Sequence, residues 1–290
     1  MGASFRAESL KLRSRPAVWV LGLIWLGLTV VLGYVAVYAF VANAPAPVPQ
    51  DIPEREREQI QQQDRQFREM QLRSLLPESA VSSALASFAN LGAAVALILG
   101  TLVVGGEYGW GTLKTIVTQL PNRSQVYAGK LLALLVILPV FAVLILAASA
   151  AASYAVASLQ ESPVDWPPPG EFVRALGAGV LILSLWAALG AFLATLFRST
   201  ALAVGLGLVY LLVLELLILS LPIPNESFRD AGSFLPGQNS IFLANSFMPG
   251  GAGSGPGLPA GAGQAALVVA AYTIVFVLLS ALIFRRRDVA

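Results

Sequence analysis

The charged side chains of this sequence that could do chemistry gather in one polar stretch, from Gly105 to Lys130. Two long apolar runs flank the stretch, and Glu107, Lys114, Arg123 and Lys130 lie in it among glycines and a proline. Carboxylate, ammonium and guanidinium groups of this kind form ion pairs with proteins and with lipid phosphates. We therefore expect the stretch to be a docking surface for a soluble protein rather than a catalytic centre.

Several kinds of chemistry are excluded by the residue types alone. The sequence has no cysteine and no histidine, which excludes disulfides, thiolate catalysis, Cys/His metal sites and a histidine proton relay. It also lacks the GxxxxGK[ST] motif that cradles nucleotide phosphates, and the Gly129-Lys130 pair lacks the glycine that this motif needs upstream. The chain is therefore not expected to hydrolyse ATP, to be an enzyme, or to bind a cofactor or metal itself.

Glu215 is the one ionisable residue well inside an apolar run. A charged side chain at the centre of a membrane helix costs about 2.5–3.5 kcal/mol on insertion scales. Residues placed there at such a cost are candidates for function, so Glu215 could contact a substrate or a cation on a translocation path. The alternative is a protonated or hydrogen-bonded glutamate that packs membrane helices together.

The elements that must position these residues are membrane helices. Of 290 residues, 57% are hydrophobic and only 12% are charged, with a mean hydropathy of +0.75; soluble domains carry about 25% charged residues. Runs of about 20 apolar residues are typical of transmembrane helices. We predict a single all-α integral membrane domain over residues 1–290 with six spans: Ala17–Val41, Ser79–Val104, Val126–Leu159, Phe172–Phe197, Thr200–Leu221 and Gly263–Phe284. The first run is too long for a signal peptide, so we expect it to remain uncleaved.

The orientation follows from the basic residues. Lys and Arg concentrate in the segments that lie on one side when both termini are placed inside, which is the arrangement that the positive-inside rule favours. We therefore predict a multi-pass protein of the cell membrane with both termini in the cytoplasm. The stretch from Gly105 to Lys130 then faces the cytosol.

Two segments are expected outside the cell. Residues 51–78 form an insertion between the first two spans, and its Glu54–Leu76 part has the charge pattern of a helix. This helix is either a solvated lead into the second span or a lid or dimer contact. Residues 222–262 form an outer loop, flexible where glycine and proline dominate; Ser233–Phe247 is apolar enough to re-enter the membrane.

The middle of the cytosolic stretch has the periodicity of a short amphipathic helix. Apolar residues fall on one face at helical spacing, and small or polar residues fall largely on the other: Trp110, Leu113, Val117 and Leu120 against Gly111, Lys114, Thr115 and Thr118. One face can lie on the membrane while the other meets a cytosolic protein. The alternative is an interfacial helix without a partner.

The same stretch carries a family resemblance. GEYGWGTLK, the P-x-R of Pro121–Arg123 and Gly129-Lys130 resemble the intracellular loop of the permease subunits of type-2 ABC exporters. Ala7–Leu21 resembles the amphipathic elbow helix that enters the first span in that family, and Leu189–Leu208 resembles its hairpin between spans four and five. The resemblance covers nearly the whole chain. The Glu54–Leu76 helix and the Gly/Pro-rich outer loop depart from it and leave the subfamily and substrate open.

The resemblance implies a function and assigns roles to residues. It implies a coupling helix that docks on a separate cytosolic ATPase, which would bind ATP and Mg²⁺; the residues in this region are Glu107, Trp110, Gly111, Thr112 and Lys114. Arg123 and Lys130 would flank it, and the alternative for both is anchoring to lipid phosphates. It further implies two permease copies, a homodimer being expected, with export of a hydrophobic or amphipathic substrate.

Other classes of protein remain open at this point. A secondary transporter or a channel is expected to show several intramembrane charges or inverted repeats, and the sequence shows one glutamate and no evident repeat. An intramembrane enzyme would need partners for a nucleophile, which the spans lack. A membrane scaffold subunit that transports nothing is the remaining alternative.

Overall fold

The computed structural model describes residues 2–43, 53–109, 123–220, 232–248, 250–251, 253 and 258–286. These residues form helices joined by turns, and no strand occurs among them, which confirms the all-α class. The long elements are α1 (Gly2–Ser14), α2 (Pro16–Val30), α4 (Glu54–Arg73), α6 (Ala93–Gly109), α8 (Arg123–Leu159), α9 (Pro169–Phe197), α10 (Thr200–Val209), α13 (Pro236–Asn245) and α14 (Ala262–Arg286). The shorter ones are η1 (Val31–Ala36), α3 (Val37–Asn43), η2 (Pro77–Ser79), α5 (Ala80–Ser87), η3 (Phe88–Gly92), η4 (Tyr210–Leu214) and α11 (Glu215–Ser220).

Five helical runs in the described part of the chain are long and apolar enough to cross a membrane: Pro16–Ala42, Pro77–Gly106, Gln125–Leu159, Pro169–Phe197 and Ala262–Arg285. They coincide with five of the six expected spans. The remaining expected span is also helical, from α10 through α11, but its apolar part is the shorter Thr200–Leu214. Glu215 follows directly, so the span Thr200–Leu221, the fifth in chain order, stays a prediction.

A proline sets the boundary between the first two helices. Pro16 occupies the first position of α2, where its missing N–H would have had no helical partner. The residue before a proline avoids the helical region, and Arg15 is extended, with φ −81° and ψ 114°. A separate helix, α1, therefore precedes α2, and its role as an elbow at the membrane interface stays a prediction.

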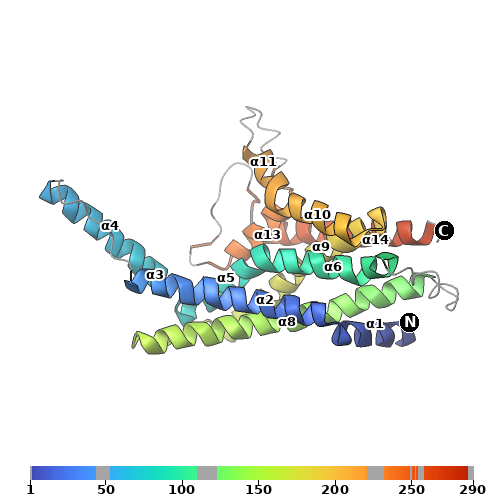
Figure 1. Ribbon diagram of the computed structural model, residues 1–290. Coiled ribbons are helices and arrows are strands. Elements are labelled where there is room, and N and C mark those ends of the chain that lie inside the picture. The colour runs from blue at the N-terminus through green and yellow to red at the C-terminus, as the bar shows by residue number, and fades with distance from the viewer. Residues whose placement is uncertain are drawn as a thin grey trace.

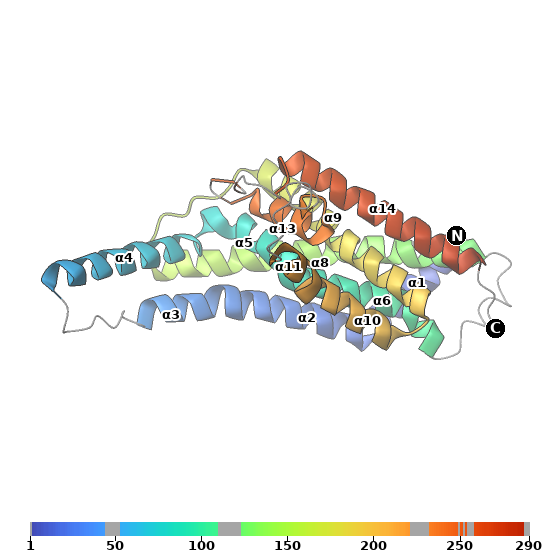
Figure 2. The same cartoon turned by 90° about the horizontal axis from the view of Figure 1, so that it is seen from above.

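The centre of the bundle is the contact between α6 and α9, which lie side by side in Figures 1 and 2. Their backbones approach so closely that a Cβ atom at Gly100 would overlap the carbonyl oxygen of Ala187. A Cβ atom at Gly190 would overlap the carbonyl oxygen of Leu97 in the same way. Small residues at such crossings let membrane helices pack at short range.

The expected tight connection between α9 and α10 is present. Phe197 ends α9, Thr200 begins α10, and only two residues separate them. Arg198 adopts the left-handed conformation with φ 51°, which reverses the chain. Ser199 then caps α10, because its hydroxyl oxygen accepts the N–H of Leu202 at 3.3 Å.

The two ends of the bundle differ. At one end of the bundle, Figures 1 and 2 show four neighbouring parts of the chain: α1, the C-terminus of α6, the N-terminus of α8 and the C-terminus of α14. The charged helix α4 projects from the opposite end. It falls within the expected Glu54–Leu76 segment, and Arg68 pairs there with Asp64 at 2.6 Å. After the orientation predicted from the sequence, we refer below to the α1 end as the inner end and the α4 end as the outer end.

One helix of the outer end lies in Ser233–Phe247, the part of the outer loop that the sequence marks as apolar. α13 lies within the loop 222–262, and its Gly237, Asn239 and Phe242 are buried. It packs against α14 and α5. This part of the loop is therefore a packed helix, because its apolar residues cover α14 and α5. Its re-entry into the membrane stays a prediction.

Candidate functional site

The inner-end stretch is framed by two helices. α6 ends at Gly109 and α8 begins at Arg123, so Glu107 and Arg123 lie in the last and first turns of these helices. The four other predicted coupling residues, Trp110, Gly111, Thr112 and Lys114, lie outside the described residues. The structure places the C-terminus of α6, where the connector starts, and the N-terminus of α8, where the connector ends.

Lys130 lies seven residues after Arg123, the first residue of α8, and is buried, with 1% of its surface exposed. Its ammonium group is 3.4 Å from Glu8 Oε1 on α1 and donates to the carbonyl of Val103 on α6 at 3.2 Å. Buried charges of this kind are tolerated when they are paired and hydrogen-bonded. The side chain therefore joins three helices and has almost no surface left for a lipid phosphate or a soluble protein.

Glu8 is the partner that sequence reasoning missed. It is 7% exposed and also accepts from Lys11 at 3.1 Å, one turn along α1. The sequence signal was weak: an acid three residues before a lysine in a short amphipathic helix. Nothing in the sequence connects Glu8 to a lysine that lies 122 residues away.

A second cation reaches the end of α6 from the junction between α1 and α2. Arg15 Nη1 donates to the carbonyl of Leu102 at 3.3 Å, and a Cβ atom at Gly106 would lie 3.3 Å from the same nitrogen. The carbonyl end of a helix attracts positive charge. Arg15 and Lys130 thus hold the N-terminal segment and the start of α8 against the end of α6.

The start of α8 is also tied to the last helix of the chain. Tyr127 stacks at a tilt on Phe284 of α14, with ring centroids 5.3 Å apart. Both are buried in a small cluster with Val104, Ala194 and Ala203. The start of α8 therefore packs in one cluster with residues of α6, α9, α10 and α14 at this end of the bundle.

Glu215 forms a second candidate site toward the outer end. It is 6% exposed. Its Oε1 accepts the phenol of Tyr210 at 2.6 Å and the N–H of Gly237 at 2.8 Å, and its Oε2 accepts the N–H of Gln238 at 3.0 Å. The two backbone donors are free N–H groups at the start of α13, so Glu215 caps this helix from another part of the chain.

The fit between Glu215 and α13 is close. A Cβ atom at position 237 would overlap Glu215 Oε2, so the site requires glycine there. Asn239 supports the same end of α13, since its amide nitrogen donates to the carbonyls of Ser233 and Leu235, both at 2.8 Å. The hydrogen-bonded alternative for Glu215 accounts for these contacts, while contact with a substrate stays a prediction. Sequence reasoning missed Tyr210 and Gly237.

Within the described ranges, no group of three or more His, Cys, Asp or Glu residues is arranged to hold a metal ion.

The sequence was compared with models of known protein families. The sequence model of the family described as "ABC-2 family transporter protein" matches residues 4–289. No curated protein matches the sequence. The family match covers both candidate sites, from α1 through the connector to α14.

Proposed function

The chain belongs to the ABC-2 family of transporter membrane proteins, and we propose that it couples the work of a cytosolic ATPase to the export of a hydrophobic or amphipathic substrate. Membership makes it a multi-pass permease subunit of an ABC transporter. Members of this family are membrane components that work with an ABC ATPase partner and are not the ATPase themselves. The substrate, the direction of transport and the coupling surface belong to the proposal.

The observation that carries the coupling proposal is the three-helix junction at the inner end. The connector from Gly109 to Arg123 starts and ends on α6 and α8. Lys130 binds these two helices to Glu8 of α1, and Arg15 adds a second tie to α6. In this proposal Lys130 acts indirectly: it keeps the connector and α1 moving as one body when the ATPase changes shape.

The remaining features of the proposal follow from the same arrangement. We propose that Trp110, Gly111, Thr112 and Lys114 contact the ATPase, with Glu107 and Arg123 at the edges of the contact. ATP and Mg²⁺ would bind to the ATPase alone, and its closure would favour an outward-open permease. Both termini would then be cytoplasmic in the cell membrane, and two identical permeases would pair about a twofold axis.

The test is co-purification of the tagged full-length protein from its own host's membranes in mild detergent. Mass spectrometry identifies the proteins that accompany it, and the ATPase activity of the preparation is measured. The variants are Gly111→Arg and Lys114→Glu in the connector. Arg65→Glu on α4, an exposed charge reversal at the outer end, is the matched control.

A Walker-motif ATPase is expected in fixed proportion with the wild type and with R65E, and it should be lost with G111R and K114E. The co-purification of no ATPase at all would contradict the coupling proposal. Retention of the ATPase by both connector variants would move the docking surface elsewhere on the inner end.

A further inference from the structure

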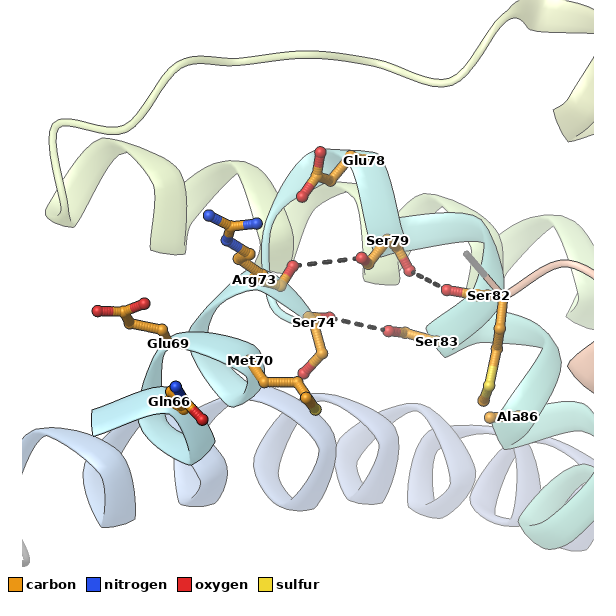
Figure 3. Close-up of a pocket in the computed structure, with 11 residues that line it drawn as sticks. Gln66, Glu69, Met70, Arg73, Ser74, Glu78, Ser79, Ser82, Ser83 and Ala86 are labelled. Atoms are coloured by element: carbon orange, nitrogen blue, oxygen red, sulfur yellow. Dashed lines mark hydrogen bonds between the residues drawn. The ribbon is translucent and has the colours of Figure 1, made fainter. Parts of the chain in front are cut away.

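An open groove of about 810 Å³ lies at the outer end, where α4 turns into η2 and α5 (Figure 3). Its lining mixes charged, hydroxyl and apolar side chains, and Met248 from beyond α13 contributes to it. Neither the proposed coupling nor the Glu215 site uses any of its residues. It is therefore a separate candidate for binding.

The depth of the groove follows from helix geometry. α5, η3 and α6 run without a break from Ala80 to Gly109, and Arg15 lies beside Gly106 at the inner end. A basic residue at a helix end marks the membrane interface. A hydrocarbon core about 30 Å thick takes about 20 residues at 1.5 Å each, and counting back from Gly106 this reaches Ala86. Ala86 lines the groove, so the groove occupies the layer of the outer lipid headgroups.

The hydroxyl groups of the groove present acceptors. Ser79 donates to the carbonyl of Arg73 at 3.2 Å, Ser82 to that of Ser79 at 2.9 Å, and Ser83 to that of Ser74 at 3.3 Å (Figure 3). A hydroxyl has one hydrogen to donate and two lone pairs. Because each hydrogen is already used on the backbone, the oxygens can only accept, and they suit a ligand that carries N–H donors.

Three charged side chains among the described residues line the groove: Glu69, Arg73 and Glu78. Within the described part of the chain, Arg73, Glu69 and Glu78 form no ion pair with one another or with any other residue. The pair of Glu69 and Arg73 has helical i,i+4 spacing, yet in Figure 3 the two side chains point apart. A guanidinium binds phosphate with two hydrogen bonds, and a carboxylate binds an ammonium.

We propose that this groove binds the headgroup of an ethanolamine phospholipid of the outer leaflet. Arg73 would hold the phosphate, and Glu78, with the serine oxygens, would accept the N–H groups of the primary ammonium. Met70, Ala86 and Met248 would cover the glycerol and the start of the acyl chains. The inference rests on the orientation proposed above, with α4 on the outer side of the membrane, but it does not depend on the ATPase coupling.

The same chemistry argues against the other common headgroups. A choline headgroup has no N–H donor and is recognised by aromatic cages, and none of the described residues that line this groove is aromatic. A phosphatidylglycerol headgroup is anionic without an ammonium, so Glu69 and Glu78 would repel it. The groove should therefore select ethanolamine over choline and over glycerol.

The test is native mass spectrometry of the delipidated full-length protein in detergent. Phosphatidylethanolamine, phosphatidylcholine and phosphatidylglycerol with identical acyl chains are titrated separately, and the apparent Kd of the first bound lipid is measured. The variants are Arg73→Gln, Glu78→Gln and Ser83→Phe, which fills the groove. Arg65→Gln and Glu58→Gln, exposed positions on α4 outside the groove, are the matched controls.

The ethanolamine lipid should bind about tenfold more tightly than the other two, the size of one charge-assisted hydrogen-bond contact. R73Q and S83F should weaken its binding about tenfold, and E78Q should remove its advantage over the choline lipid. Equal affinities for the three lipids would overturn the proposal. So would an ethanolamine preference that survives all three groove variants, or a loss in R65Q as large as in R73Q.

Discussion

Glu215 of α11 accepts the backbone N–H of Gly237 at 2.8 Å and thereby caps α13, a helix that begins 21 residues later in the chain. The carboxylate is buried, and its other two donors are Tyr210 and the N–H of Gln238. The side chain of one helix thus satisfies the backbone donors at the start of another. The position of α13 at the outer end follows that of α11.

Replacement of Glu215 by alanine should destabilise the protein. The N–H groups of Gly237 and Gln238 would lose their acceptor, and a buried unsatisfied donor costs about 1–3 kcal/mol. We expect a clear fall in the melting temperature, measured by fluorescence-detected size-exclusion after heating in detergent. Glu58→Ala, on the exposed face of α4, is the control and should leave the melting temperature unchanged. Equal melting temperatures for E215A and wild type would contradict the capping role.

Gly237→Ala tests the same contact from the other side. The new Cβ atom would overlap Glu215 Oε2, and overpacking of this kind costs about 1–3 kcal/mol. Gly263→Ala, near the start of α14, has open space around the new atom and serves as the control. The same heating assay should separate the two variants, and a G237A protein as stable as G263A would show that α13 can shift without cost.

The ion pair between Lys130 and Glu8 should behave as a buried unit. Lys130→Met leaves Glu8 with the more exposed Lys11 and without its buried partner, so we expect a loss of stability up to about 3 kcal/mol, the cost of breaking a buried pair. Adding Glu8→Gln should restore part of the loss, because the buried carboxylate that has lost this partner is then removed. The measurement is a double-mutant cycle on thermal stability. Additive effects of the two substitutions would show that the pair is not coupled.

The crossing of α6 and α9 should tolerate no side chain at Gly100. Gly100→Ala places a Cβ atom on the carbonyl oxygen of Ala187, so the helices must separate or shift. We expect reduced yield of monodisperse protein and a lower melting temperature. Gly177→Ala on α9, where nothing lies within 4 Å of the new atom, should match or slightly exceed the wild type. A monodisperse G100A protein with unchanged stability would contradict the close crossing.

The membrane spans could be predicted from the hydropathy of the sequence alone. Long apolar runs must form helices in a membrane, because every backbone polar group has to be satisfied within the segment. For that reason the five helical runs that are long and apolar enough to cross a membrane, of which Pro16–Ala42 is the first, could be predicted with boundaries close to those observed. Pro16 likewise fixed the break after α1, and the pair Arg198-Ser199 fixed the turn before α10, through local backbone chemistry.

The contacts within the two candidate sites could not be predicted from hydropathy. The sequence determined that Glu215 is a costly charge within an apolar run, and that Lys130 lies near the start of another such run, where a charge also needs partners. Only the tertiary structure decided which partners they have: Glu8 and Val103 for Lys130, and Gly237 and Gln238 for Glu215. The reason is physical. Desolvation is a property of one residue in its own apolar segment, whereas an ion pair or a helix cap depends on which helix faces meet, and that is set by close packing across the whole bundle.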